Sequence, residues 1–107
     1  MSDFYKRTLR SILDSVILEA LQEKPDHGYS LIKIVRKRHG VLMGPSTVYP
    51  LLNDLEKKGL VTAKWKFSNS KPQKQYNITF QGKRALEQMH LDIEILVDSL
   101  QIERSSL

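Results

Sequence analysis

The sequence predicts a mainly helical (α+β) fold, with three N-terminal helices, a two-stranded hairpin and a final helix. Two observations predict this class. Apolar residues recur at intervals of three and four through most of the 107-residue chain, which is the period of helices buried on one side. Between about residues 61 and 80 the period changes to two around a Ser-Asn-Ser-Lys-Pro segment, as in two strands joined by a turn.

The first two helices are predicted at residues 8–24 and at about residues 27–39. The first carries a wide apolar stripe, made by Leu9, Ile12, Leu13, Val16, Ile17, Ala20 and Leu21. Pro25 is expected to end it. In the second helix Leu31, Ile34 and Val35 are expected to point inward, with basic residues outward, and Gly40 to end it.

The third helix is predicted between Gly44 and Gly59. Ser46 is placed to cap its first turn, and an apolar face follows at Val48, Leu51, Leu52 and Leu55. Two lysines followed by Gly59 are typical of a helix end. Pro50 would remove one backbone hydrogen bond near the start, so it fits either a tolerated first-turn proline or a functional one.

The second and third helices, joined by a short glycine-containing link, predict a helix-turn-helix. The outward side of the third helix carries hydroxyl, phenol, amide and charged groups, at Thr47, Tyr49, Pro50, Asn53, Asp54 and Lys57. Such groups suit the edges of bases and the oxygens of phosphates. We therefore predict that this segment is a DNA recognition helix.

The hairpin predicts a DNA-binding wing. Val61, Ala63, Trp65 and Phe67 alternate with polar residues in its first strand, as do Tyr76, Ile78 and Phe80 in its second. Lys71 and Lys74 are expected at the tip, where they could lie along a phosphate backbone or enter a minor groove. An ordinary solvated loop is the alternative, and Trp65 is expected to pack in the core or at the wing base.

The last helix is predicted from Gln81 to about Glu103, with Thr79 as its cap. Its apolar residues step by three and four, a spacing that suits packing against a second copy, at Leu86, Met89, Ile93, Leu96, Val97 and Leu100. Burial within the chain is the alternative. We expect one compact unit in which residues 1–80 form the DNA-binding part and residues 81–107 the dimerisation helix.

The net charge of +5 is unevenly spread along the chain. Residues 27–74 hold ten Lys or Arg against two acids, whereas residues 1–26 and 82–107 are each slightly acidic. A localised basic region is typical of a protein that binds a polyanion, although solvated lysines on a small domain are the alternative.

The composition argues against other classes of protein. The chain has no cysteine, no apolar run long enough for a membrane span and no signal-peptide pattern, so we expect a cytoplasmic protein. His27, His39 and His90 fall in different helices without ligand spacing. Neither catalytic residues, nor a metal site, nor a cofactor is predicted.

Several segments together resemble the PadR family of winged-helix transcriptional regulators. They are His27-Gly28-Tyr29, the run from Pro45 to Leu52, the run from Leu55 to Val61, and Tyr76 to Thr79 with Gly82. The resemblance covers roughly residues 9–86 and is closest to short members with a single helix after the wing. It implies a homodimeric, repressor-like regulator in which the terminal helix and the first helix together form the dimer interface.

The resemblance also implies roles for individual residues. Ser46, Thr47, Tyr49 and Asn53 would read DNA, and Lys71 and Lys74 would lie on the wing. Tyr29 would either bond a phosphate or serve in packing. Any small-molecule effector would have to bind in the cleft of the dimer.

Two other functions remain open at this stage. A small architectural or virus-encoded protein would bind double-stranded DNA without an effector and with little preference for sequence. A winged helix used only for protein contacts would show no salt-dependent binding to DNA.

Overall fold

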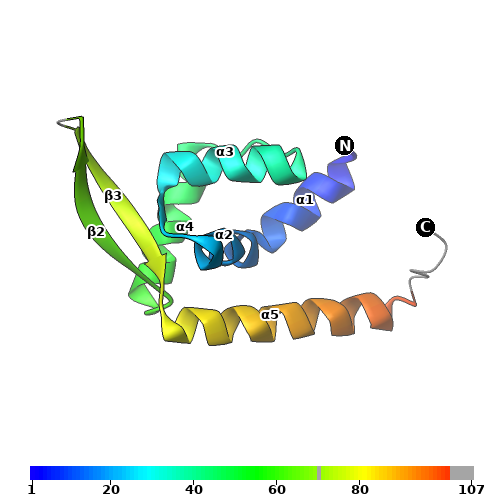
Figure 1. The fold of residues 1–107 in the computed structure, drawn as a ribbon. Helices are drawn as coiled ribbons and strands as arrows, with labels where there is room; N and C mark the ends of the chain where they lie inside the picture. Colours follow the sequence, from blue (N-terminus) through cyan, green and yellow to red (C-terminus); the bar gives the residue numbers. More distant parts are fainter. Residues whose placement is uncertain (70, 102–107) are drawn as a thin grey trace.

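A computed structural model describes residues 1–69 and 71–101, and within them the chain forms five helices and three strands (Figure 1). The elements are α1 (Asp3–Ser11), α2 (Leu13–Glu23), β1 (Asp26–His27), α3 (Gly28–His39), α4 (Pro45–Lys57), β2 (Val61–Ser68), β3 (Lys71–Ile78) and α5 (Phe80–Ser99). The predicted α+β class, with a hairpin between a helical body and a final helix, is confirmed.

The single first helix predicted at residues 8–24 is wrong, because the chain forms two helices that meet at Ile12. The backbone of Ile12 leaves the helical region, with φ −114° and ψ 22°. Hydroxyl groups compete for the backbone at this point: Ser11 donates to the carbonyl of Thr8 at 2.6 Å and Ser15 to that of Ile12 at 2.7 Å. The apolar stripe continues across the break, so the periodicity gives no sign of it.

The helix-turn-helix is formed by α3 and α4. Gly40 ends α3 with φ +71°, a left-handed conformation that suits glycine, as predicted. The cap predicted at Ser46 is wrong, since Gly44 precedes the first turn, Pro45 opens it, and no side chain caps it. At the other end Gly59 has φ +76°, and the amide of Leu60 donates to the carbonyl of Leu55 at 2.9 Å.

The sheet has three strands rather than the two predicted. β2 and β3 pair in antiparallel register from Val61 opposite Ile78 to Ser68 opposite Lys71. β1 adds two residues to the other edge of β3, with His27 opposite Gln75. Phe80, predicted as the last residue of the second strand, instead begins α5, because Thr79 caps that helix by accepting a hydrogen bond from the amide of Gly82 at 3.0 Å.

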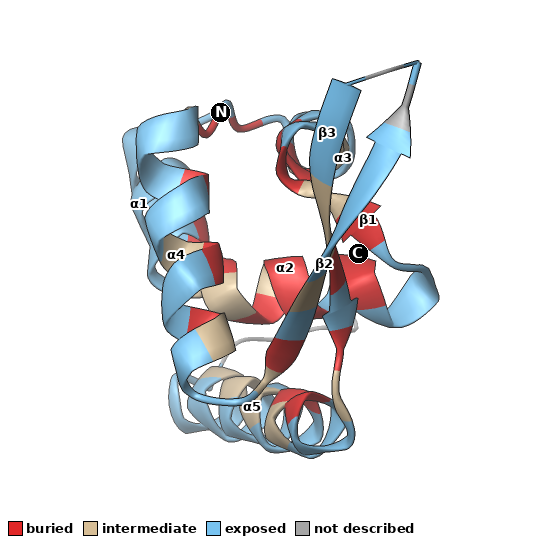
Figure 2. Ribbon diagram, turned by 90° about the vertical axis from the view of Figure 1, so that its left-hand side faces the viewer, coloured by how far each residue is buried: buried red, intermediate tan, exposed pale blue. Residues whose placement is uncertain are grey.

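The core lies between α2, α3, α4 and the base of the sheet. Figure 2 shows buried positions on the sides of α4 and α2 that face each other and at the base of β2 and β3. The core includes Ile17, Leu31, Val48, Leu52 and Tyr76, each 1% exposed or less. The outer side of α4 is therefore free for contacts outside the chain.

α5 runs beyond this body (Figure 1). The radius of gyration is 15.1 Å, larger than the roughly 13 Å expected of a compact chain of this length. Leu86, near the start of α5, is 2% exposed and belongs to the core, whereas Leu96 and Leu100 are 59% and 62% exposed. Within the described residues no helix is both long and apolar enough to cross a membrane, and the predicted end near Glu103 lies outside those residues.

Candidate nucleic-acid interface

The outward side of α4 carries the residues predicted to read DNA. Their backbone positions follow from the helix period, because the buried face of α4 is set by Val48, Leu52 and Leu55. Six predicted residues are exposed along the rest of the helix, namely Ser46, Thr47, Tyr49, Pro50, Asn53 and Lys57. The structure thus places these side chains on one helix surface, free of the core.

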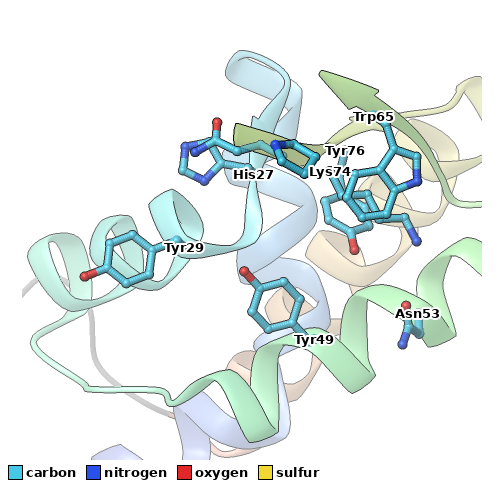
Figure 3. A pocket seen from close by; sticks show the side chains of 9 residues that line it. His27, Tyr29, Tyr49, Asn53, Trp65, Lys74 and Tyr76 are labelled. Atoms are coloured by element: carbon cyan, nitrogen blue, oxygen red, sulfur yellow. The ribbon is translucent and has the colours of Figure 1, made fainter. Parts of the chain in front are cut away.

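An open cleft of about 440 Å³ separates α4 from the wing (Figure 3). Tyr49 and Asn53 line it from α4, Trp65 and Lys74 from the wing, and His27 from the start of α3. Five lining residues carry aromatic rings, if the imidazole is counted, and only one carries a permanent charge. Planar rings beside an amide and an ammonium group offer stacking surfaces together with hydrogen-bond donors.

The ring of Tyr49 rests against the backbone of Gly28, at the start of α3. A Cβ atom added to Gly28 would lie 2.5 Å from Cε1 and 2.9 Å from the hydroxyl oxygen of Tyr49. Carbon atoms in contact ordinarily lie about 3.5–4.0 Å apart, so only glycine leaves room for the ring in this position. The missing side chain at Gly28 therefore lets the Tyr49 ring pack against α3. Tyr49 is 39% exposed, and its hydroxyl points toward α3.

His27 and Asp26 shape the start of α3 beside the cleft. Nδ1 of His27 accepts a weak hydrogen bond from the amide of Ser30 at 3.4 Å, which caps the helix. The buried carboxylate of Asp26 accepts from the amide of His27 at 2.9 Å and from the hydroxyl of Ser30 at 2.8 Å. Tyr29 follows with 58% of its surface exposed and Nζ of Lys33 4.7 Å above its ring centre.

The two wing lysines differ in their surroundings. Lys71 is exposed at the first residue of β3, next to the turn of the hairpin, as predicted. Lys74 does not lie at the tip: its Nζ is 3.3 Å from Oε1 of Glu56 on α4, and it stands over the Tyr76 ring. Lys74 thus ties the wing to α4. Burial raises the pKa of the Tyr76 phenol, and the charge of Lys74 opposes that effect.

The prediction that Trp65 packs in the core or at the wing base is wrong. Trp65 is 64% exposed and Phe67 78% exposed, although both lie on the same face of β2 as the buried Val61. The strand extends past the edge of the core, so the apolar face continues into solvent. Trp65 is therefore a cleft residue that the sequence reasoning missed. Its position, four residues beyond the start of the strand, was the feature of the sequence that could have indicated an exposed aromatic residue.

The predicted dimer residues of α5 separate into two groups. Leu86 is in the core of the chain itself and has almost no surface left for a second subunit. Met89 and Ile93 are partly buried and line an apolar groove of about 240 Å³ with Leu96 and Ile12. Val97 is partly buried and Leu100 is exposed further along the helix.

Within residues 1–69 and 71–101, no three side chains of the metal-ligating types gather at one place. What the structure brings together is a polar helix surface, an aromatic cleft and a basic wing. A helix-turn-helix arranged in this way beside a hairpin defines a winged-helix DNA-binding protein.

Comparisons with known proteins place the chain within that class. The sequence model of the transcriptional regulator PadR-like family matches residues 17–88, and the chain belongs to this family. Its members are transcriptional regulators, so the predictions of a DNA-binding regulator and of a protein that is not an enzyme are confirmed.

Individual relatives agree with this assignment. The crystal structure of a PadR family transcriptional regulator from Eggerthella lenta is 34% identical, with a TM-score of 0.82 over 89% of this chain and 83% of that chain. A PadR family transcription regulator from Clostridium difficile R20291 is 27% identical, with a TM-score of 0.74 over 85% of this chain and 99% of that chain.

A longer relative also matches. The transcriptional regulator YqjI of Escherichia coli K12 is 29% identical over 87 residues, which are 79% of this chain and 41% of that protein. The chain thus spans about two-fifths of the length of the curated relatives it matches.

Proposed function

We propose that the chain is a homodimeric repressor that binds a pseudo-palindromic operator. The observation that carries the proposal is the outward side of α4, where Thr47, Asn53 and Lys57 are exposed and Asn53 lines the cleft between α4 and the wing. An amide can bond bidentately to adenine, and hydroxyl and ammonium groups suit phosphates. α4 would enter the major groove, and Lys71 would follow the backbone at its side.

Dimerisation is supported by the exposed apolar residues of α5. Leu96 and Leu100 extend the stripe begun by Met89 and Ile93, and nothing in the described part of the chain covers them. A second copy related by a two-fold axis would bury this stripe. It would also present two α4 helices to successive major grooves, about 34 Å apart or a multiple of that distance.

Repression would then be steric, because a dimer bound at a promoter blocks polymerase. A small-molecule effector, where one exists, would act by favouring a different angle between the two winged domains. A regulator of this kind must reach the genome, so we propose a cytoplasmic location.

The first test is binding to the DNA upstream of the protein's own gene and to a scrambled duplex of equal length. Anisotropy at two salt concentrations would measure both affinities. We expect the upstream DNA to be preferred by a factor on the order of 10³ or more. Equal affinity for both duplexes would favour an architectural protein, unless duplexes selected from a random pool reveal an operator elsewhere.

Two substitutions separate sequence reading from backbone binding. Asn53→Ala should lower affinity for the operator by about 1–3 kcal/mol and leave scrambled DNA nearly unaffected. Lys71→Ala should weaken binding to both duplexes and make the dependence on salt shallower by about 0.9 per contact. If Asn53→Ala weakened both duplexes equally, its role as a reader of bases would be refuted.

A further inference from the structure

A second basic site lies on the side of α4 that faces away from the wing. Lys6 and Arg10 of α1 and Arg36 of α3 line one depression of about 330 Å³, together with Gly40, Val41 and Leu42 of the link before α4. All three basic side chains are exposed. No Asp or Glu lines the depression.

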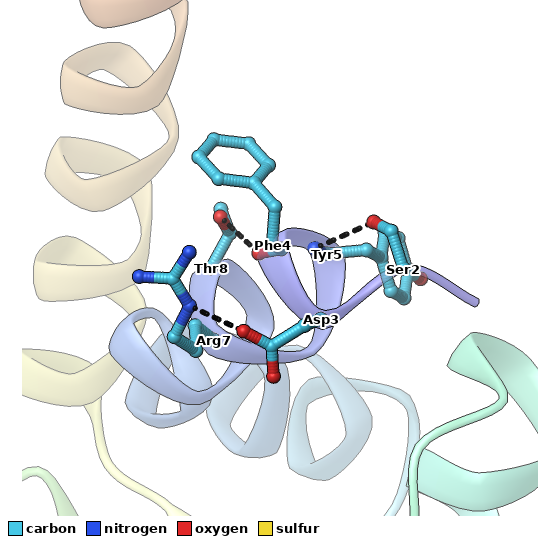
Figure 4. A network of polar contacts seen from close by, with 6 residues as sticks. All are labelled: Ser2, Asp3, Phe4, Tyr5, Arg7 and Thr8. Atoms are coloured by element: carbon cyan, nitrogen blue, oxygen red, sulfur yellow. Dashed lines mark hydrogen bonds and ion pairs between the residues drawn. The ribbon is translucent and has the colours of Figure 1, made fainter.

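Within residues 1–69 and 71–101, no acidic side chain forms an ion pair with Lys6, Arg10 or Arg36. Some basic residues elsewhere in the described part of the chain are paired: Arg7 bonds Asp3 at 3.0 Å (Figure 4), Lys58 bonds Asp54 at 2.9 Å, and Arg38 pairs with Glu23. Lys6 and Arg10 make no such bond although Arg7, on the same helix, does.

Helix dipoles account for only part of this arrangement. Arg10 and Arg36 lie in the last turns of α1 and α3, where a cation gains about 0.3–1 kcal/mol from the helix terminus. Lys6 lies in the middle of α1 and gains no such stabilisation. Three like charges around one hollow therefore repel each other unless an anion lies between them.

The position of the cluster indicates which anion it serves. Arg10 also lines a neighbouring depression with Asp14 of α2 and with Thr47 and Leu51 of α4, so the cluster adjoins the exposed side of α4. α4 is thus bordered by α1 at this depression, and Figure 1 shows the wing and α1 on opposite sides of the molecule. DNA lying along α4 would bring its backbone over both borders.

We propose that Lys6, Arg10 and Arg36 form a phosphate-binding site for the DNA backbone, on the flank of the recognition helix opposite the wing. The proposal rests on the proposed DNA-binding function and extends it to three residues outside the helix and the wing. The sequence count missed the site because Lys6 and Arg10 belong to an N-terminal segment whose total charge is slightly negative.

The test is binding to a 30-base-pair duplex of arbitrary sequence, measured by anisotropy at five or more salt concentrations. If the chain is a dimer, Arg10→Gln removes two contacts and should reduce the slope of log K against log salt by about 1.8, and Arg10→Gln with Arg36→Gln by about 3.6. Lys24→Gln is the matched control. It also removes one exposed charge, and it immediately precedes β1, which lies across the molecule from α1 (Figure 2).

The outcomes separate this proposal from the proposed function. The phosphate site alone would be overturned if the Arg10 and Arg36 variants had the same salt slopes and DNA affinities as the control while Lys71→Ala still bound DNA more weakly. If the unsubstituted protein failed to bind any duplex, both proposals would fail. A second experiment is calorimetric titration with inorganic phosphate. If the substitutions abolished phosphate binding but left DNA binding unchanged, the depression would be a site for small anions and its assignment to DNA would be overturned. Sedimentation and thermal unfolding of each variant would show that fold and assembly are intact.

Discussion

Gly28→Ala should displace the ring of Tyr49 and thereby connect the start of α3 to the DNA-reading side of α4. The added Cβ would lie 2.5 Å from Cε1 of Tyr49, so the ring must move by at least about 1 Å to restore ordinary contact. Overpacking of this kind costs about 1–3 kcal/mol. We expect the lower half of that range, because the overlapping atoms are the far end of a side chain that borders an open cleft.

A double-mutant cycle isolates this contact from other effects of the substitution. In a Tyr49→Ala background the ring is absent, so Gly28→Ala should be neutral or slightly stabilising, because alanine favours helices over glycine by up to about 1 kcal/mol. The coupling energy between the two sites should therefore be about 1–2 kcal/mol.

The four proteins of the cycle would be compared by urea unfolding at one protein concentration, since an oligomer's stability depends on concentration. Equal destabilisation by Gly28→Ala with and without the Tyr49 ring would refute the steric argument and place the requirement for glycine in the backbone of α3. In the protein that retains Tyr49, we also expect Gly28→Ala to weaken DNA binding, because the displaced Tyr49 ring would enter the cleft.

Three further substitutions or measurements follow from the structure. Thr79→Ala should lower the free energy of unfolding by about 1–2 kcal/mol in urea titrations because it removes the cap of α5, whereas Ser46→Ala, which removes no cap, should change it by less than about 0.5 kcal/mol. Leu96→Glu should convert the proposed dimer to monomers in sedimentation experiments. Leu91→Glu, a change to an exposed leucine outside the apolar stripe of α5, should not; a dimer that survives Leu96→Glu would exclude that stripe from the interface. The chain has one tryptophan, Trp65, so its fluorescence should shift to shorter wavelength when DNA covers the cleft, and an unchanged spectrum at saturating DNA would contradict a role for the cleft in binding.

Local signals in the sequence were sufficient for most of the elements. The limits of α3 and α4 follow from Gly40 and Gly59, which both adopt left-handed conformations that other residues adopt at a cost. The cap at Thr79 and the antiparallel hairpin were also predicted, because each depends on residues close together in the chain. The break at Ile12 was not, since hydroxyl groups interrupt the backbone there without disturbing the apolar period.

The composition of the site depended on tertiary structure that no local pattern contains. Alternation identified the face of β2 that holds Trp65, but it could not show that the strand extends beyond the core. The pairing of Lys74 with Glu56 joins two residues eighteen positions apart in the chain, and β1 is too short to produce a strand pattern. Charge counted by segment likewise separated Lys6 from Arg36, which the fold brings to one depression.

The junction between α4 and α5 would connect the geometry of the proposed dimer to DNA binding. Thr79 donates its hydroxyl to the carbonyl of Gly59 at 2.7 Å and its amide to the carbonyl of Leu60 at 3.0 Å, so the start of α5 is bonded to the end of α4. Gly82 packs so closely on the same segment that a Cβ there would lie 2.1 Å from the carbonyl oxygen of Leu60. Because close backbone packing leaves little freedom for one helix to pivot on the other, a change in the angle between two paired α5 helices would be transmitted to the two recognition helices. The spacing of the α4 helices, and with it the fit to two successive major grooves, would then be set at the dimer interface rather than within each winged domain.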